Sequence, residues 1–243
     1  MKNLLAKYGT LSPLTSDETE VIENLSSVKV TCEAGKDLVA GDFDEPDQLF
    51  IVEEGRLFAS LELPSGDRAI TRLYYAGDIV GTANVPFEHA TQTITVNAPS
   101  TIYVFPRRHL IEAFTDMPRI AAIFYTFAAL ESAILNDRLV SVGRTRGKSR
   151  LASLILEIEA RHSLAVPDPG KAFDIGLTQT QIGEAIGLTS IQVNRLFRAL
   201  DEDGLISRDK SEIEILDRDR LTEIGQFRNR YEDLDLDWFD EHF

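Results

Sequence analysis

The sequence contains very little cysteine, since Cys32 is the only one among 243 residues. A single thiol can form no disulfide within the chain and cannot hold an iron–sulfur cluster by itself. Long hydrophobic runs are missing too, because no uninterrupted apolar stretch approaches the ~20 residues that a membrane-spanning helix needs. The chain does not open with a charged segment followed by an apolar one, so we expect no secretion signal. These absences predict a cytoplasmic protein that does not enter a membrane.

Sequence patterns typical of enzymes and metal sites are also missing. The chain has no Gly-x-Ser-x-Gly nucleophile elbow, no Gly-x-x-x-x-Gly-Lys phosphate loop, no Rossmann glycine set and no His/Cys spacing suited to a metal. Haem ligation by His89 or Cys32 is conceivable, but a lone loop histidine is usually solvated, and Cys32 fits better as a small core residue of a strand. We therefore predict no enzymatic activity, no cofactor and no metal.

Positive charge is scarce, with 25 Lys and Arg against 40 Asp and Glu and a net charge of −15. This balance argues against nucleic-acid binding, because DNA-binding surfaces are usually basic. The distribution changes that interpretation, since residues 144–198 carry eight basic and five acidic side chains. Salt screens charges beyond ~8 Å under physiological conditions, so a local basic patch can bind DNA on an acidic protein. Such binding should weaken strongly as the salt concentration rises.

The segment TQTQIGEAIGLTSIQVNRLFRALDEDGLI, residues 178–206, is the most informative part of the chain. Two Thr-x-x-Gln capping boxes, Thr178 with Gln181 and Thr189 with Gln192, predict the starts of two helices. Gly187 lies between these helices, where the chain needs a left-handed backbone conformation. Apolar residues at helical spacing would pack the two helices together: Ile182, Ile186, Leu188, Val193, Leu196 and Leu200. The pattern predicts a helix-turn-helix, whose second helix can enter the major groove of DNA.

Between about residues 29 and 106, short segments alternate apolar and polar residues and are separated by glycines. This alternation predicts an antiparallel barrel or jelly roll, although a β-sandwich without a ligand has the same pattern. We expect a short helix at 107–116 and a long helix from there to about 142, after the start signal at 116–118. Residues 205–216 would form a two-stranded wing with Arg208, Asp209 and Lys210 at its tip.

The predicted long helix carries an apolar stripe at spacings of three and four residues. About 25 residues at 1.5 Å each give a rod of ~37 Å, which is longer than one small barrel can cover on both sides. Pairing with a second copy of the chain would bury the remaining stripe. The expected dimer contacts are Ile120, Ile123, Phe127, Leu130 and Ile134. The alternative is a core helix of a single domain.

A glycine-punctuated β-roll, a long helix, a hinge and a winged helix-turn-helix, in this order, resemble the CRP/FNR family of bacterial transcription regulators. The firmest matches are the helix-turn-helix segment and the β-roll sequences IVEEGRL and YYAGDIVG. The resemblance implies an α+β chain with a cyclic-nucleotide-binding-like β-roll. Its expected parts are the β-roll domain (1–116), the dimerisation helix (117–143), the hinge (144–147), the winged helix-turn-helix (148–218) and an acidic carboxy-terminal helix and tail (219–243). It also implies a homodimer that binds a pseudo-palindrome in double-stranded DNA and recruits or blocks RNA polymerase.

By this resemblance the recognition helix starts at Ser190, where Ser-Ile replaces the Arg-Glu that family members often carry. The expected base-reading residues are Ser190, Ile191, Gln192, Asn194 and Arg195. Arginine can form two bonds to guanine, so Arg195 is the candidate guanine reader, while Gln192 and Asn194 are candidates to contact adenine or a phosphate. Gln192 could instead serve only its capping box. The expected phosphate contacts are Thr178, Gln179, Thr189, Arg198, Arg208 and Lys210.

In nucleotide-binding relatives a phosphate cassette begins Gly-Glu and carries Arg-Ser about ten residues later. Here Thr82 follows Gly81, and Gln92 and Thr93 stand in place of the Arg-Ser pair. On the long helix, Leu135-Asn136 replaces a Thr-Ser pair that meets the purine. A buried phosphate without a cation loses charge-assisted bonds of about 1.5–3 kcal/mol each. We therefore expect no tight cAMP binding, and the identity of any small-molecule effector stays open.

The chain ends in the acidic and aromatic segment EDLDLDWFDEHF. It could be a solvated end, as acidic segments usually are, or a clamp whose aromatic residues dock on the body near the DNA-binding face. The competing function is a signal-binding or protein-interaction module of the same fold, which acts through a partner protein instead of an operator.

Overall fold

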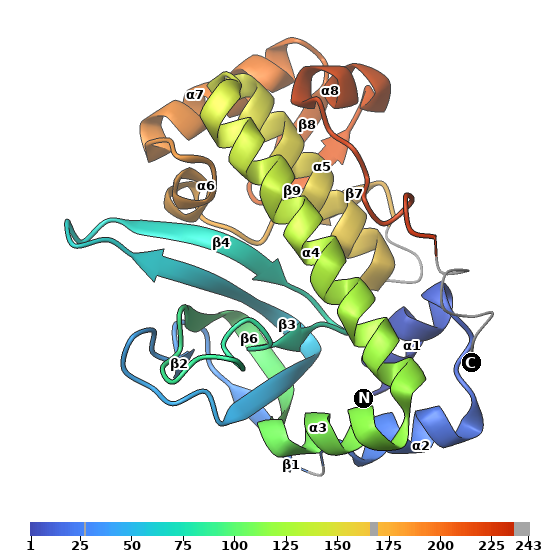
Figure 1. Cartoon of the computed structure of the whole chain (residues 1–243). Helices are drawn as coiled ribbons and strands as arrows, with labels where there is room; N and C mark the ends of the chain where they lie inside the picture. The colour runs from blue at the N-terminus through green and yellow to red at the C-terminus, as the bar shows by residue number, and fades with distance from the viewer. Residues whose placement is uncertain (27, 166–169, 236–243) are drawn as a thin grey trace. The chain divides into compact units, whose positions relative to one another are not determined.

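The structure is a computed structural model of the whole chain, and it describes residues 1–26, 28–165 and 170–235. The chain divides into two compact units. The amino-terminal unit is made mainly of Met1–Leu61 and Thr71–Ser132. The carboxy-terminal unit is made of Glu62–Ile70 and Ala133–Asp233. Each unit is described by itself below, with elements labelled as in Figure 1.

The amino-terminal unit is an antiparallel β-roll with helices before and after it in the chain. Its elements are α1 (Lys2–Leu11), α2 (Ser16–Asn24), β1 (Val28–Cys32), β2 (Asp37–Val39), β3 (Gln48–Glu62), β4 (Arg68–Tyr74), β5 (Ile79–Val80), β6 (Thr93–Pro106), α3 (Arg107–Asp116) and the first half of α4 (Pro118–Arg144). The sheet order is β1-β6-β3-β4, with β2 also on β6 and β5 also on β3. The predicted β-roll, short helix and long helix are thereby confirmed.

Alternation along β3 explains why this unit has two apolar cores. Leu49 and Ile51 point to one side of the strand, where they join residues of α1, α3 and α4 in the first core. Phe50 and Val52 point to the other side, into the interior of the roll. Both faces of β3 are therefore buried, which fixes its register against β6.

The two helices at the amino terminus were not predicted. Helix α1 has no side-chain cap at its start, so the sequence gives no local signal for it. Helix α2 does begin with a full capping box between Thr15 and Glu18. Glu18 also accepts hydrogen bonds from the Arg119 guanidinium at 2.8–2.9 Å, which ties α2 to α4.

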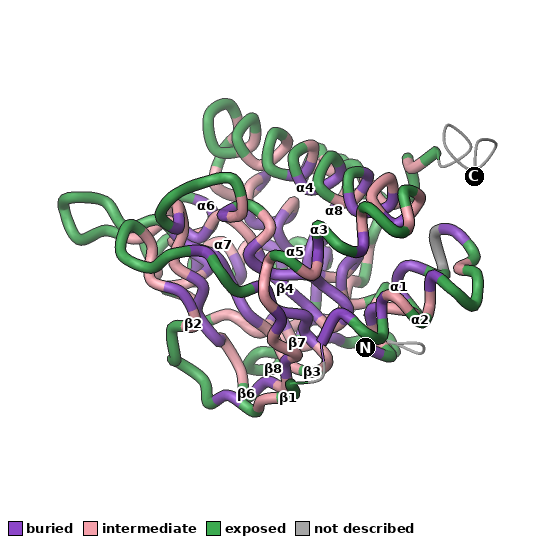
Figure 2. The backbone as a smooth tube through the Cα atoms, turned by 60° about the horizontal axis from the view of Figure 1, so that its bottom comes forward, coloured by how far each residue is buried: buried purple, intermediate pink, exposed green. Residues whose placement is uncertain are grey.

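The stripe predicted to meet a second copy is instead part of the chain's own core, so that assignment of dimer contacts is corrected. Ile120, Ile123, Leu130 and Ile134 are buried within the single chain, and Phe127 is half-buried. Ile120 and Ile123 belong to the core that includes residues of β3 and α1, and Phe127 packs against that core. Another face of α4 stays exposed (Figure 2).

The exposed face of α4 carries its own apolar stripe. Its members are Tyr125, Ala128, Ser132, Leu135, Leu139 and Val142, all exposed in the single chain. Their spacing alternates between three and four residues, as the contact positions of a two-helix coiled coil do. Among the described residues, α4 is also the one helix long and apolar enough to cross a membrane by length and composition, with 33% of its most apolar window buried.

The carboxy-terminal unit is built around α5 (Gly147–Ala165), most of which is buried. The other elements are β7 (Ala172–Asp174), α6 (Gln179–Ile186), α7 (Ser190–Glu202), β8 (Ile206–Asp209), β9 (Glu212–Ile215) and α8 (Arg218–Gly225). Strands β7, β9 and β8 form a three-stranded antiparallel sheet, so the predicted wing is confirmed and gains β7.

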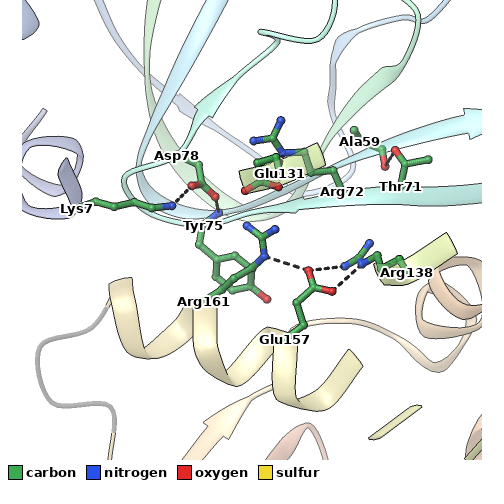
Figure 3. A network of polar contacts seen from close by, with 10 residues as sticks. All are labelled: Lys7, Ala59, Thr71, Arg72, Tyr75, Asp78, Glu131, Arg138, Glu157 and Arg161. Atoms are coloured by element: carbon green, nitrogen blue, oxygen red, sulfur yellow. Dashed lines mark hydrogen bonds and ion pairs between the residues drawn. The ribbon is translucent and has the colours of Figure 1, made fainter. Parts of the chain in front are cut away.

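The buried carboxylate of Glu157 links α4 to α5 near the point where the two helices join. Glu157 on α5 accepts hydrogen bonds from Arg138 at 2.7 and 3.0 Å and from Arg161 at 3.1 Å (Figure 3). Glu157 and Arg161 are buried. A carboxylate between two guanidiniums is the arrangement that lets charged groups be buried, because each lost hydration contact is replaced. The same unit bonds Arg230, beyond α8, to Asp137 on α4 at 2.6 and 2.7 Å.

Candidate nucleic-acid interface and effector region

Two capping boxes position the helix-turn-helix as the sequence predicts. The Thr178 hydroxyl accepts from the Gln181 backbone N–H at 3.2 Å, and the Gln181 side chain accepts from the Thr178 N–H at 2.9 Å. Thr189 and Gln192 repeat this exchange at 3.3 and 2.9 Å. Gly187 ends α6 with φ of 66°, in the left-handed region that a side chain disfavours. Local chemistry therefore fixes where each helix starts and how the chain turns.

A glycine inside α6 allows the turn to lie close against it. A Cβ built on Gly183 would lie 2.2 Å from the carbonyl oxygen of Leu188. Ile182, Ile186, Val193 and Leu200 are buried between the helices, as predicted, whereas Leu188 and Leu196 are only half-buried.

Phe197 is a buried residue of the recognition helix that the sequence interpretation missed. It lies four residues after buried Val193, and this helical spacing was the available signal. Its ring also lies 4.2 Å from the Arg208 guanidinium of the wing, measured from the ring centroid. Phe197 therefore links the helix to the wing.

The five predicted base-reading residues are all solvent-accessible on α7. Ile191 is 66% exposed, Gln192 and Arg195 are exposed, and Ser190 and Asn194 are half-buried. Within the described residues, no hydrogen bond or ion pair holds the Arg195 guanidinium. Gln192 differs, because its side-chain oxygen accepts from the Thr189 N–H and hydroxyl at 2.9 and 3.1 Å. Only the amide nitrogen of Gln192 remains available for a base.

The wing holds one cation beside the recognition helix. The Nε–H of Arg208 donates to the Lys210 carbonyl at 2.8 Å while its guanidinium stacks on Phe197. Burial lowers the pKa of Arg208 from its ordinary value, yet arginine stays charged at neutral pH. Arg198, Lys210, Thr178 and Thr189 are exposed and Gln179 is half-buried. Their contacts to phosphate stay predictions.

In the region that matches the phosphate cassette, uncharged side chains and backbone groups form hydrogen bonds with one another. Gly81 is buried with φ of 94°, and its carbonyl accepts from the Asn84 N–H. The Asn84 side-chain oxygen accepts from the Thr91 N–H at 3.0 Å and from the Thr91 hydroxyl at 2.9 Å. The Thr93 hydroxyl accepts from the Gly41 N–H at 3.0 Å. All of these bonds join neutral groups.

None of the predicted cassette residues Gly81, Thr82, Gln92 and Thr93 can supply a cation to a cyclic phosphate. Leu135 and Asn136 belong to the carboxy-terminal unit and are exposed on α4. Across residues 1–26, 28–165 and 170–235, there is also no group of three His, Cys, Asp or Glu side chains that could hold a metal ion.

Comparisons with known proteins agree with this geometry. Residues 29–116 match the cyclic nucleotide-binding domain family, and residues 149–224 match the Crp-like helix-turn-helix domain family. The transcriptional regulatory protein btr of Bordetella pertussis is 28% identical over 216 residues, covering 88% of each chain. The fumarate and nitrate reduction regulatory protein of Escherichia coli K12 is 24% identical over 220 residues, covering 89% of this chain and 87% of its own.

Among solved structures, FixK2 from Bradyrhizobium japonicum superposes with a TM-score of 0.74 at 20% identity, covering 81% of this chain and 96% of its own. That similarity establishes the fold. With both domain families in the family's order, a capped helix-turn-helix and a wing, the chain is a member of the CRP/FNR family of DNA-binding transcription regulators.

Proposed function

We propose that the protein is a cytoplasmic homodimer that binds a pseudo-palindromic site in double-stranded DNA through α7, and recruits or blocks RNA polymerase. The observation that carries this proposal is the outward face of α7, where Arg195 is exposed and held by no described neighbour. A guanidinium that serves the fold is normally paired. One left in solvent on a groove-sized helix is available to a base edge. No catalytic role is proposed for any residue.

Each recognition helix would read one half-site, with the two half-sites about 34–36 Å apart. Arg195 is proposed to bond to guanine and Asn194 to adenine or a phosphate. Ile191 fits a thymine methyl group, because its apolar side chain is 66% exposed at the start of the helix. Arg208, positioned by Phe197, is proposed to hold a phosphate beside the groove.

The dimer seam is proposed to be the exposed stripe of α4. Its spacing suits a two-helix seam, and Leu139 is 70% exposed in the single chain. Exposed leucine and valine side chains on a helix gain stability when a second copy covers them, at roughly 25 cal/mol per Å² of apolar surface. A soluble partner helix also accounts for the apolar composition of α4 without a membrane.

Control by cAMP is not part of the proposal. The cassette offers neutral groups where a cyclic phosphate needs a cation, and the Thr93 hydroxyl already accepts a hydrogen bond from the Gly41 N–H. Binding there would cost the existing bonds and leave the phosphate charge without a partner. Any effector must therefore be recognised by different chemistry.

The test is a binding titration of Arg195→Ala on operator fragments selected by the wild-type protein from its own genome. Losing a bidentate guanine contact should weaken specific binding by about 1–3 kcal/mol, roughly 5- to 150-fold, and relax specificity at one base pair. Arg220→Ala is the matched control, because Arg220 is exposed on α8 and, within residues 1–26, 28–165 and 170–235, its side chain forms only a long 3.7 Å pair with Asp217. It should change affinity by less than about twofold, as expected of a surface charge outside the interface.

An unchanged specific affinity for Arg195→Ala would remove that residue from the interface. The second candidate function, a protein-interaction module, predicts that no genomic fragment is retained by the wild-type protein at low salt. Retention that weakens linearly with the logarithm of the salt concentration would support DNA binding instead.

A further inference from the structure

A cavity in the amino-terminal unit lies outside the phosphate cassette. It has a volume of about 320 Å³ and is lined by residues of α1, α3, α4 and the segment 77–86. This volume lies at the lower end of the range for small-molecule sites in proteins, roughly 300–1,000 Å³. Of the cassette residues, only Thr82 reaches its wall.

Five aromatic side chains line the cavity, and four of them contact one another: Tyr8, Phe114, Phe124 and Phe127. Tyr8 stacks on Phe127 with ring centroids 4.5 Å apart, and Phe114 meets Phe124 edge-on at 5.2 Å. Tyr8 also contacts Phe124 edge-on at 5.8 Å. Rings packed in this way make a preformed apolar surface, which an entering molecule need not reorganise. Flat apolar rings are therefore the kind of molecule that can stack against this part of the wall.

Four charged groups at the edge of the cavity neutralise one another. The Lys7 ammonium pairs with Asp78, and Arg72 pairs with Glu131 at 3.0 Å (Figure 3). Asp78 also accepts from the Tyr75 N–H at 2.8 Å. A charged ligand would have to displace one member of a pair, leaving the other poorly solvated, which is costly. An uncharged ring with one polar atom could instead bond to the edge of a pair without breaking it.

The cavity reaches the exposed stripe of α4. Tyr125 and Ala128 line it, and both are members of that stripe. Tyr125 is 67% exposed in the single chain. A bound molecule would therefore touch residues that the proposed dimer also uses.

We propose that this cavity is a binding site for an uncharged aromatic or similarly apolar molecule, and that its occupancy alters the α4 dimer seam and hence DNA binding. The binding site stands on the cavity alone. The regulatory effect rests on the proposed function. Such a ligand differs in class from a cyclic nucleotide, which the cassette is unsuited to hold.

The first experiment measures binding of indole and 1-naphthol to the full-length protein by calorimetry, with indole-3-acetate and tryptamine as charged analogues. The neutral probes should bind at one site per chain, at least tenfold more tightly than the charged analogues, a difference of about 1.4 kcal/mol or more. Failure of both neutral probes to bind, or equal binding of the charged analogues, would overturn the proposal.

Two alanine-to-leucine substitutions on α4 test where the neutral probes bind. Ala121 lines the cavity, so Ala121→Leu should fill part of it and weaken the neutral probes at least tenfold. Ala129 lies on the same helix, is exposed and does not line the cavity, so Ala129→Leu should leave probe affinity within about twofold of wild type. Equal loss in both variants, or no loss in Ala121→Leu, would place the probes elsewhere and refute the site.

Regulation is tested by repeating the operator titration with saturating indole. For the wild type, indole should change the affinity for the operator at least threefold, which is about 0.65 kcal/mol from RT ln 3. For Ala121→Leu, indole should leave the operator affinity unchanged. Unchanged affinity with demonstrated indole binding would overturn the regulatory part. If the protein bound no operator at all, the proposed function would fail, while the calorimetric test of the cavity would be unaffected.

Discussion

The substitution Gly183→Ala has two opposite effects on the free energy of unfolding: a higher helix propensity and a steric clash. The close packing around Gly183 indicates that the clash is the larger effect. Gly183 lies inside α6, where replacing glycine by alanine normally stabilises a helix by about 0.8–1 kcal/mol. Here the new methyl group would lie 2.2 Å from the Leu188 carbonyl oxygen and 3.3 Å from the Leu188 carbonyl carbon. Both are backbone atoms of the turn, so no side-chain rotation can relieve the contact.

Relief requires the turn to move by about 1 Å, since non-bonded carbon contacts are comfortable near 3.5–4.0 Å. The turn is held by the bond from the Leu188 N–H to the Gly183 carbonyl at 3.0 Å, and directly by the Thr189 capping box. Overpacking costs about 1–3 kcal/mol, and a 2.2 Å contact with backbone belongs at the upper end of that range. After subtraction of the propensity gain, we expect a net loss of about 1–2 kcal/mol, or roughly 4–15 °C in the unfolding temperature of a unit of this size.

Gly143→Ala is the control, because Gly143 is also helical and a Cβ there would meet nothing within 4 Å. It should leave stability unchanged or raise it by up to about 1 kcal/mol. Thermal unfolding followed by circular dichroism compares the two variants, and operator binding reports whether α7 has moved. An unfolding temperature for Gly183→Ala at or above that of wild type would refute the close packing of turn and helix.

Two further predictions concern acid stability and the carboxy terminus. Burial raises the pKa of Glu18, but hydrogen bonds from Thr15 and the Arg119 guanidinium outweigh it and lower the pKa below the ordinary 4.5. The ionised Glu18 carboxylate therefore stabilises the fold fully above about pH 4.5, and this stabilisation is lost as the pH falls through the lowered pKa. In urea titrations, Glu18→Gln should reduce the difference in the free energy of unfolding between pH 7 and pH 3. The same difference in the variant and the wild type would contradict this prediction. Ending the chain after Arg230 keeps the ion pair of Arg230 with Asp137, but it removes the acidic end and the Tyr231 ring, which lies 5.8 Å from the Arg161 guanidinium. If the acidic end acts as a clamp, the truncated protein should bind the operator more tightly or associate with it faster. Identical binding by the truncated and full-length proteins would refute the clamp, whose Trp238 and Phe239 lie outside the described residues.

The parts of the fold that sequence alone predicted are those fixed by short-range chemistry. Both helix starts follow from a threonine and a glutamine three residues later, and the turn follows from Gly187. The wing follows from strand alternation around a turn, with Lys210 at φ of 55°. Each signal is a contact within four residues of the chain, so it survives in the sequence without knowledge of the fold.

The parts that could not be predicted depend on contacts far apart in the sequence. Helix α1 has no cap and an ordinary composition, and it is held by pairs such as Lys7 with Asp78, 71 residues apart. The aromatic cavity likewise joins Tyr8 to Phe124 and Phe127. No local periodicity contains this information, because tertiary packing selects the partners.

Helix α4 shows why periodicity alone does not tell which apolar face of a helix is left for a second copy. Apolar residues at spacings of three and four show that some face is covered, but not what covers it. The bulkiest stripe, with Ile120 and Ile123, covers the chain's own sheet and amino-terminal helices, while a second stripe from Tyr125 to Val142 stays exposed. One apolar face of α4 is buried within the single chain, and the other would be buried only by a second copy or another partner. Since Tyr125 and Ala128 belong both to the exposed stripe and to the wall of the cavity, a second copy and a bound molecule would act on the same two side chains.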